Sequence, residues 1–130
     1  MRLASRVDSS SLLALGAQQK ALFGMDESGA LPVAIQRLDT CLTSPLARPY
    51  LLKIDVQGFE LEVLKGATAL LPEIDAVDVE ASDLELYQGQ PLRAEIEQFL
   101  LDAGFHVSGH FNAQFHQGQR IQADWLFRRA

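Results

Sequence analysis

The apolar positions of the chain follow two periods, one typical of strands and one typical of helices. Residues 50–56 (YLLKIDV) are apolar except for one lysine and one aspartate, which is typical of a strand buried on both faces of a parallel sheet. Residues 74–81 (IDAVDVEA) alternate apolar and acidic positions and predict a second strand with one more polar face. Between them, near-helical spacing over residues 61–71 predicts an amphipathic helix ending near Pro72. Together these elements form a βαβ unit, whose crossover should be right-handed.

The last third of the chain predicts a helix and then a hairpin. Pro91 is expected at the first position of a helix whose apolar stripe runs over residues 92–103, and Gly104 is a suitable end for it. Two alternating runs follow, 105–111 and 121–127, with a polar loop between them. They predict an antiparallel hairpin that ends the sheet, and the whole pattern indicates an α/β fold.

The amino-terminal part carries weaker signals. Residues 1–30 contain turn-forming glycines and little periodicity, so we expect irregular structure with at most a short helix. The alternation over residues 33–37 predicts a short strand that leads into a loop. Pro45 and Pro49 keep that loop from continuing as a long helix.

Composition excludes several classes of protein. Hydrophobic residues make up 48% and charged residues 22%, so the chain should fold rather than remain disordered. Its net charge of −6 disfavours nucleic acid and anionic membranes as partners, because binding to phosphates needs basic residues. No apolar run approaches the roughly 18 residues of a membrane-spanning helix. One cysteine, Cys41, and a poor secretory signal favour a cytoplasmic location.

Asp55 and Glu80 are the candidate catalytic residues. Each comes near the end of one of the two predicted parallel strands, where ligands of open α/β sheets bind. Two such acids can act as a general base with an orienting partner, or hold a divalent cation. Two carboxylates alone do not specify a cation site, so no metal is predicted. The alternatives are a helix-capping role for Asp55 and a solvent-facing position for Glu80.

Other polar residues allow structural interpretations as well. Lys53 lies inside an apolar strand and must reach solvent or pair with an acid. Tyr87, in the loop after the second strand, is a candidate substrate contact or a partly buried anchor. His106 and His110 are an even number of residues apart and should share the more polar face of a strand. With His116 they are interpreted as surface residues, and Cys41 has no nearby base that would make it a nucleophile.

Five separate blocks of the sequence follow one another in a recognisable order. The longest is LLKIDVQGFELEVLKGA at residues 51–67. The others are SSSLL at 9–13, VAIQRLD at 33–39, ELYQGQPL at 85–92 and QADWLF at 122–127. In their order and approximate spacing these blocks resemble the FkbM-type methyltransferases, which use S-adenosylmethionine and have the Rossmann-like class I fold. The resemblance implies an O-methyltransferase that acts on a hydroxyl of a sugar, lipid or natural product. It also implies that Asp55, Val56 and Gln57 lie beside the transferred methyl group. Glu80 and Tyr87 are candidate substrate contacts from their positions in the chain.

The chain departs from the family pattern in one respect. The family holds its cofactor with a glycine-rich turn after the first strand and an acidic residue ending the second. The nine glycines here are scattered and form no such motif. By resemblance, residues 1–130 are therefore expected to form a single partial domain, the carboxy-terminal half of a truncated Rossmann-like sheet, without the cofactor-binding half.

This departure leaves three functional interpretations open. The chain is part of a methyltransferase, a noncatalytic remnant that binds no cofactor alone, or a subunit completed by another chain. In each case the first parallel strand would leave an apolar sheet edge unpaired, which favours self-association or pairing with a complementing chain.

Overall fold

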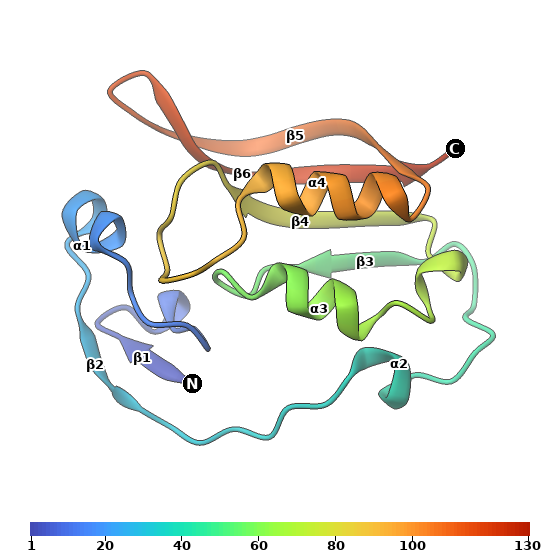
Figure 1. Cartoon of the computed structure of the whole chain (residues 1–130), viewed down its shortest axis with the longest axis horizontal. Helices are drawn as coiled ribbons and strands as arrows, with labels where there is room; N and C mark the ends of the chain where they lie inside the picture. Colours follow the sequence, from blue (N-terminus) through green and yellow to red (C-terminus); the bar gives the residue numbers. More distant parts are fainter.

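The structure is a computed structural model that describes residues 1–130, and its centre is a four-stranded mixed sheet (Figure 1). The strand order is β3–β4–β6–β5. The strands are β3 (Leu51–Ile54), β4 (Ala76–Ser82), β5 (Phe105–His116) and β6 (Gln119–Arg129). β3 and β4 are parallel, whereas β6 is antiparallel to both β4 and β5. These features confirm the mixed α/β architecture, the parallel pair and the carboxy-terminal hairpin.

Helices cover one face of this sheet (Figure 1). The helices α3 (Glu60–Gly66) and α4 (Arg93–Asp102) follow β3 and β4 in the chain. Their buried apolar side chains pack against alternate residues of β4 and β6 in one core cluster, which includes Leu64, Ile96, Leu100, Val77, Val79, Trp125 and Phe127. The intervening residues of the strands therefore point to the face that these helices leave uncovered.

The amino-terminal residues form a smaller unit beside the sheet. β1 (Arg2–Ala4) and β2 (Glu27–Ala30) pair antiparallel, and the short helices η1 (Val7–Ser9) and α1 (Ala17–Phe23) lie between them in the chain. A second apolar cluster joins this unit to the loop after β4 and to β6 through Ala4, Leu15, Met25, Leu86, Tyr87 and Ile121. The short helix was expected, whereas the two-stranded sheet was not.

Two strand predictions need correction. Residues 33–37 form no strand, because no other segment pairs with them, and Ile35 is 65% exposed. The strand predicted over residues 50–56 is present but shorter, and it is not buried on both faces. β3 pairs only with β4, which makes it an edge strand, and its Leu51 is 58% exposed.

Two helix boundaries also differ from the prediction. α3 ends at Gly66, and the chain continues through turns into a short 3₁₀ helix, η2 (Leu71–Glu73). A further short helix, α2 (Leu38–Cys41), lies in the expected loop region. α4 begins two residues after Pro91, with Leu92 at the N-cap and its N–H bonded to the side chain of Glu95 at 3.1 Å. Gly104 has a φ of +87° and ends α4 as predicted.

The hairpin is longer than predicted and contains an irregularity that separates two histidines. The expected polar loop is largely strand, and the turn consists of Gln117 and Gly118, which both have positive φ. A bulge between Val107 and Gly109 shifts the register, so His106 lies opposite Arg128 and His110 opposite Trp125. The two histidines therefore lie on opposite faces, and the prediction that they share one was wrong.

No helix of the structure has the length and apolar character needed to cross a membrane.

Candidate functional site

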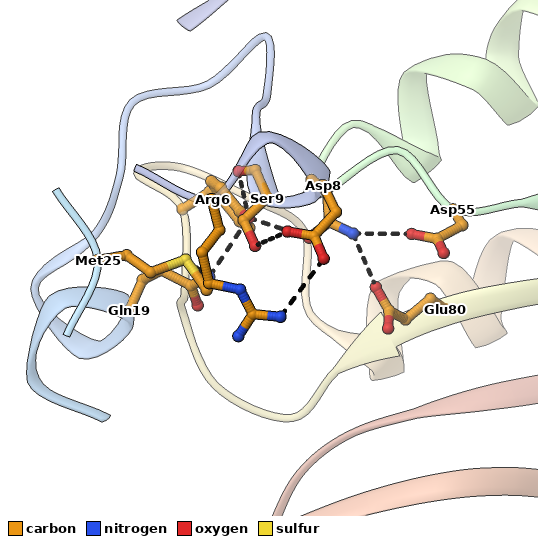
Figure 2. Close-up of polar contacts among 9 residues, drawn as sticks. Arg6, Asp8, Ser9, Gln19, Met25, Asp55 and Glu80 are labelled. Atoms are coloured by element: carbon orange, nitrogen blue, oxygen red, sulfur yellow. Dashed lines mark hydrogen bonds and ion pairs between the residues drawn. The ribbon is translucent and has the colours of Figure 1, made fainter. Parts of the chain in front are cut away.

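The structure brings Asp55 and Glu80 together at the ends of neighbouring parallel strands. Asp55 follows the last residue of β3, and Glu80 lies near the end of β4. The side-chain nitrogen of Gln57 donates to Asp55 Oδ1 at 2.8 Å and to Glu80 Oε2 at 3.4 Å. Figure 2 shows both carboxylates pointing towards one nitrogen. These two residues, called here the acid pair, lie on the face of the sheet that α3 and α4 do not cover.

The capping interpretation of Asp55 does not fit its position. The N-cap of α3 is Phe59, and no side chain caps this helix. The Asp55 carboxylate instead accepts a hydrogen bond from Gln57 and is exposed at the rim of the sheet. Asp55 is thus available to groups outside the protein.

Glu80 has an unusual electrostatic environment for an acid. Partial burial raises its pKa to about 7, and the negative charge of nearby Asp55 contributes further. A second carboxylate, that of Asp124, acts in the same direction. Glu80 therefore keeps its proton below about pH 7 and is ionised above it.

A second charged group on the same face pairs its acids with a cation. Lys53 Nζ lies 3.3 Å from Asp78 Oδ1 and 2.7 Å from Asp124 Oδ1, and we call these three residues the Lys53 cluster. Burial alone would lower the pKa of Lys53, but the two acids raise it. Burial alone would raise the pKa of Asp124, but hydrogen bonds from Lys53 and Asn112 lower it. Lys53 was expected to reach solvent or to pair with an acid, and it does both.

Gln57 is held in place by residues far away in the sequence. Its φ is +52°, a conformation that is uncommon for residues other than glycine. The hydroxyl of Ser11 donates to the Gln57 carbonyl at 2.6 Å, and the hydroxyl of Tyr87 donates to the Gln57 side-chain oxygen at 2.9 Å. The turn after β3 is therefore fixed from the amino-terminal unit and from the loop after β4.

Tyr87 lies in the core and not on a ligand-facing surface. It is only 2% exposed, and its hydroxyl is also within 2.9 Å of the Ser9 carbonyl. Burial, and then the charge of Glu80, raise the pKa of the phenol above its ordinary value, so the hydroxyl stays protonated. The anchor interpretation of Tyr87 therefore matches its position better than direct substrate contact does.

A cavity of about 910 Å³ lies beside the turn after β3. Its walls come from residues 8–12, from the extended segment 33–38 and from α3, and half of the lining residues are hydrophobic. Asp55, Val56 and Gln57 all line it, whereas Glu80 and Tyr87 do not. Three of the residues predicted from the sequence, Asp55, Val56 and Gln57, thus line the cavity. Glu80 lies outside it but shares the side-chain nitrogen of Gln57 with Asp55.

One buried acid was not anticipated from the sequence. Glu60 is only 3% exposed, and one of its oxygens accepts the N–H of Gly58 at 2.8 Å. Burial raises its pKa although the amides of the turn act in the opposite direction. Its place shortly after a glycine, at the first position of α3, is the sequence signal that could have pointed to this role.

The remaining candidates show no catalytic arrangement. The three histidines are exposed, and Cys41 is an exposed thiol that donates to the side-chain oxygen of Gln36 at 3.2 Å. No group of three or more histidine, cysteine, aspartate or glutamate residues is arranged to hold a metal ion.

Comparison with known proteins identifies relatives of this chain. Residues 5–107 match the model of the methyltransferase FkbM domain. The chain belongs to the FkbM methyltransferase family. It is also similar to the 2-O-methyltransferase NoeI of Sinorhizobium fredii (strain NBRC 101917 / NGR234), with 39% identity over 102 residues. That match covers 77% of this chain but only 38% of the relative, and no solved structure matches the chain.

Proposed function

We propose that this chain carries the catalytic edge of an O-methyltransferase that uses S-adenosylmethionine and acts on a hydroxyl of a small molecule, such as a sugar, lipid or natural product. The observation that carries the proposal is the acid pair, whose exposed member, Asp55, lines a large cavity beside the turn after β3, while Glu80 lies at the same rim of the sheet. Family membership and the name of the Sinorhizobium relative support the reaction class.

The cavity fits the proposed cofactor in size and chemistry. Small-molecule sites have volumes of about 300–1,000 Å³ and mostly apolar walls with a few polar groups, and this cavity matches that description. The Asp55 carboxylate supplies a negative charge that favours a sulfonium cation. Asp55, Val56 and Gln57 are the residues that would hold the group, which supplies an electrophilic methyl carbon when bound. Because the matched relative is much longer than this chain, we assign the other cofactor contacts to polypeptide outside residues 1–130.

The acid pair would remove the proton of the acceptor hydroxyl. Asp55 lies at the cavity and accepts this proton, while Glu80 adds a second carboxylate that increases the proton affinity of the pair. Above about pH 7 Glu80 is ionised and the pair can accept a proton, whereas below it Glu80 already carries one. Alignment of the acceptor oxygen would contribute much of the rate, since proximity supplies about 7–11 kcal/mol in favourable cases.

A chimera gives the direct test of this function. Residues of this chain would replace the matching segment of the Sinorhizobium relative, and transfer of labelled methyl groups to a panel of hydroxylated sugars, lipids and natural products would be measured. We expect transfer by the chimera and its loss in the Asp55→Asn variant. Equal transfer by both proteins would contradict the catalytic role of Asp55, and a folded but inactive chimera would count against the proposed function.

A second candidate is a noncatalytic remnant or complementing subunit, and the exposed edge of β3 favours it. Leu51 on this edge is 58% exposed, and nothing pairs with the strand on that side. If this interpretation is correct, the chain alone should self-associate in light scattering and bind S-adenosylmethionine no tighter than about 100 μM in calorimetry. Tight, saturable binding by a clean monomer would exclude it.

A further inference from the structure

The side chain of Gln57 is engaged by protein groups on both sides of its amide. The nitrogen donates to Asp55 and Glu80, and the oxygen accepts from the hydroxyl of Tyr87. These three partners come from the end of β3, from β4 and from the loop that precedes α4. The side-chain amide of Gln57 therefore makes its hydrogen bonds within the protein.

The backbone at this position cannot relax easily to another conformation. Gln57 has a φ of +52° and the following Gly58 a φ of +96°. A Cβ atom on Gly58 would lie 3.1 Å from the Cβ atoms of Tyr87 and Gln90, so the turn is packed closely against the loop before α4. Ser11 and Glu60 bind the backbone of the two turn residues at 2.6 and 2.8 Å. A left-handed residue that is so fully constrained is typical of a functional site.

We infer that Gln57 is a positioning residue whose side-chain amide bridges the acid pair and fixes the geometry of its two carboxylates beside the cavity that Gln57 also lines. The amide donates to the Glu80 carboxylate and so favours its ionised form, which opposes the rise in the pKa of Glu80 caused by burial and by the charge and hydrogen bond of Asp55. The effect of Gln57 on turnover rests on the proposed function, but its effect on the titration of Glu80 does not.

The positive φ of Gln57 permits a test that separates the backbone from the side chain. Glycine suits this conformation, so Gln57→Gly removes the amide without adding backbone strain. Gln117 in the hairpin turn has nearly the same φ, +49°, and is exposed, so Gln117→Gly is a matched control far from the acid pair. Both variants should keep the thermal stability of the parent chain.

Titration of Glu80 by NMR of carboxyl-labelled glutamate in the full chain gives the readout. We expect Gln57→Gly to raise the midpoint of Glu80 by about one pH unit, because the ionised carboxylate loses a donor, and Gln117→Gly to leave it unchanged. If Gln57→Gly fails to fold, Gln57→Asn replaces it, since asparagine tolerates positive φ but is too short to bridge both acids, and the same rise is expected. An unchanged Glu80 midpoint in a folded Gln57 variant would overturn the inference.

The chimera adds a second readout with a separate meaning. Gln57→Gly should lower kcat at least tenfold, with a smaller change in KM and a pH profile displaced in the same direction as the Glu80 midpoint. Unchanged kcat together with an unchanged pH profile would overturn the inference. A displaced Glu80 midpoint in a chimera series without any methyl transfer would support the bridge and count against the proposed function.

Discussion

Two groups of acids lie on the same uncovered face of the sheet, and they differ in the group that bridges them. In the Lys53 cluster an ammonium group lies between Asp78 and Asp124 and compensates their charge. In the acid pair, only the neutral amide of Gln57 lies between Asp55 and Glu80. Hydrogen bonds from Lys53 and Asn112 lower the pKa of Asp124 against the effect of burial, whereas burial, and then the charge of Asp55, raise the pKa of Glu80 to about 7. The compensated group stabilises strand pairing, whereas the uncompensated one is suited to accept a proton.

The largest expected effect comes from removing one acid from each group. In the chimera, Asp55→Asn should lower turnover by about 10²–10⁴, because the amide has no useful proton affinity. Its melting temperature should barely change, since asparagine keeps an acceptor oxygen for Gln57. Asp78→Asn is the matched control from the Lys53 cluster and should retain most of the activity. Equal losses in the two variants would show that the contrast between the groups has no catalytic meaning.

Removal of the second member of the pair should have a smaller effect on activity. Glu80→Gln is expected to lower turnover by about tenfold, because Asp55 remains as a base but without its partner. The rise of turnover near pH 7 should move to lower pH, since that rise reports the loss of the last proton from the pair. A pH–rate profile of the variant identical to that of the parent would contradict the assignment.

The same substitution should change stability in a pH-dependent way. The pKa of Glu80 is raised from 4.5 to about 7 in the folded chain, so its stabilising contribution is present below about pH 4.5 and is lost as the pH rises through 7. Glutamine does not ionise and avoids this loss. With allowance for partial exposure of the side chain, Glu80→Gln should be more stable than the parent by about 1–2 kcal/mol at pH 8 relative to pH 5. Denaturant unfolding of both proteins at pH 5 and pH 8 measures the two free energies of unfolding. If the variant differed from the parent by the same amount at both pH values, the raised pKa of Glu80 would be refuted.

The smallest effect is expected in the compensated group. Lys53→Met leaves Asp78 and Asp124 without their shared cation, but the side chain of Lys53 is 45% exposed, so the cost should be only about 0.5–1 kcal/mol. Lys20→Met, at an exposed position of α1, serves as the control and should cost less. Urea unfolding of the two variants measures both costs. A loss of stability in Lys53→Met no larger than that in Lys20→Met would show that the Lys53 cluster does not stabilise the fold.

The sequence was most informative where one period dominates. β4, α4 and the hairpin follow clear alternation or helical spacing, so their type and order were predictable. The edge position of β3 and the irregular path of residues 31–37 were not, because burial of an apolar strand depends on partners that periodicity does not reveal.

Only part of the candidate site was predictable from the sequence. The placement of Asp55 and Glu80 at one rim followed from the parallel arrangement of their strands. The roles of Gln57 and Tyr87 did not, because they depend on a positive φ and on a contact between Ser11 and Gln57, which are 46 residues apart. Burial of Glu60 likewise depends on how the turn after β3 folds back over the start of α3.

Titration of Glu80 in the parent chain and in Asp55→Asn tests the central claim most directly, since the claim is that two uncompensated carboxylates form one proton-binding unit. NMR of carboxyl-labelled glutamate reports the midpoint in each protein. The account predicts a midpoint near 7 in the parent chain and a fall of about one unit when the charge of Asp55 is removed. A midpoint near the ordinary glutamate value of 4.5 in both proteins would contradict it.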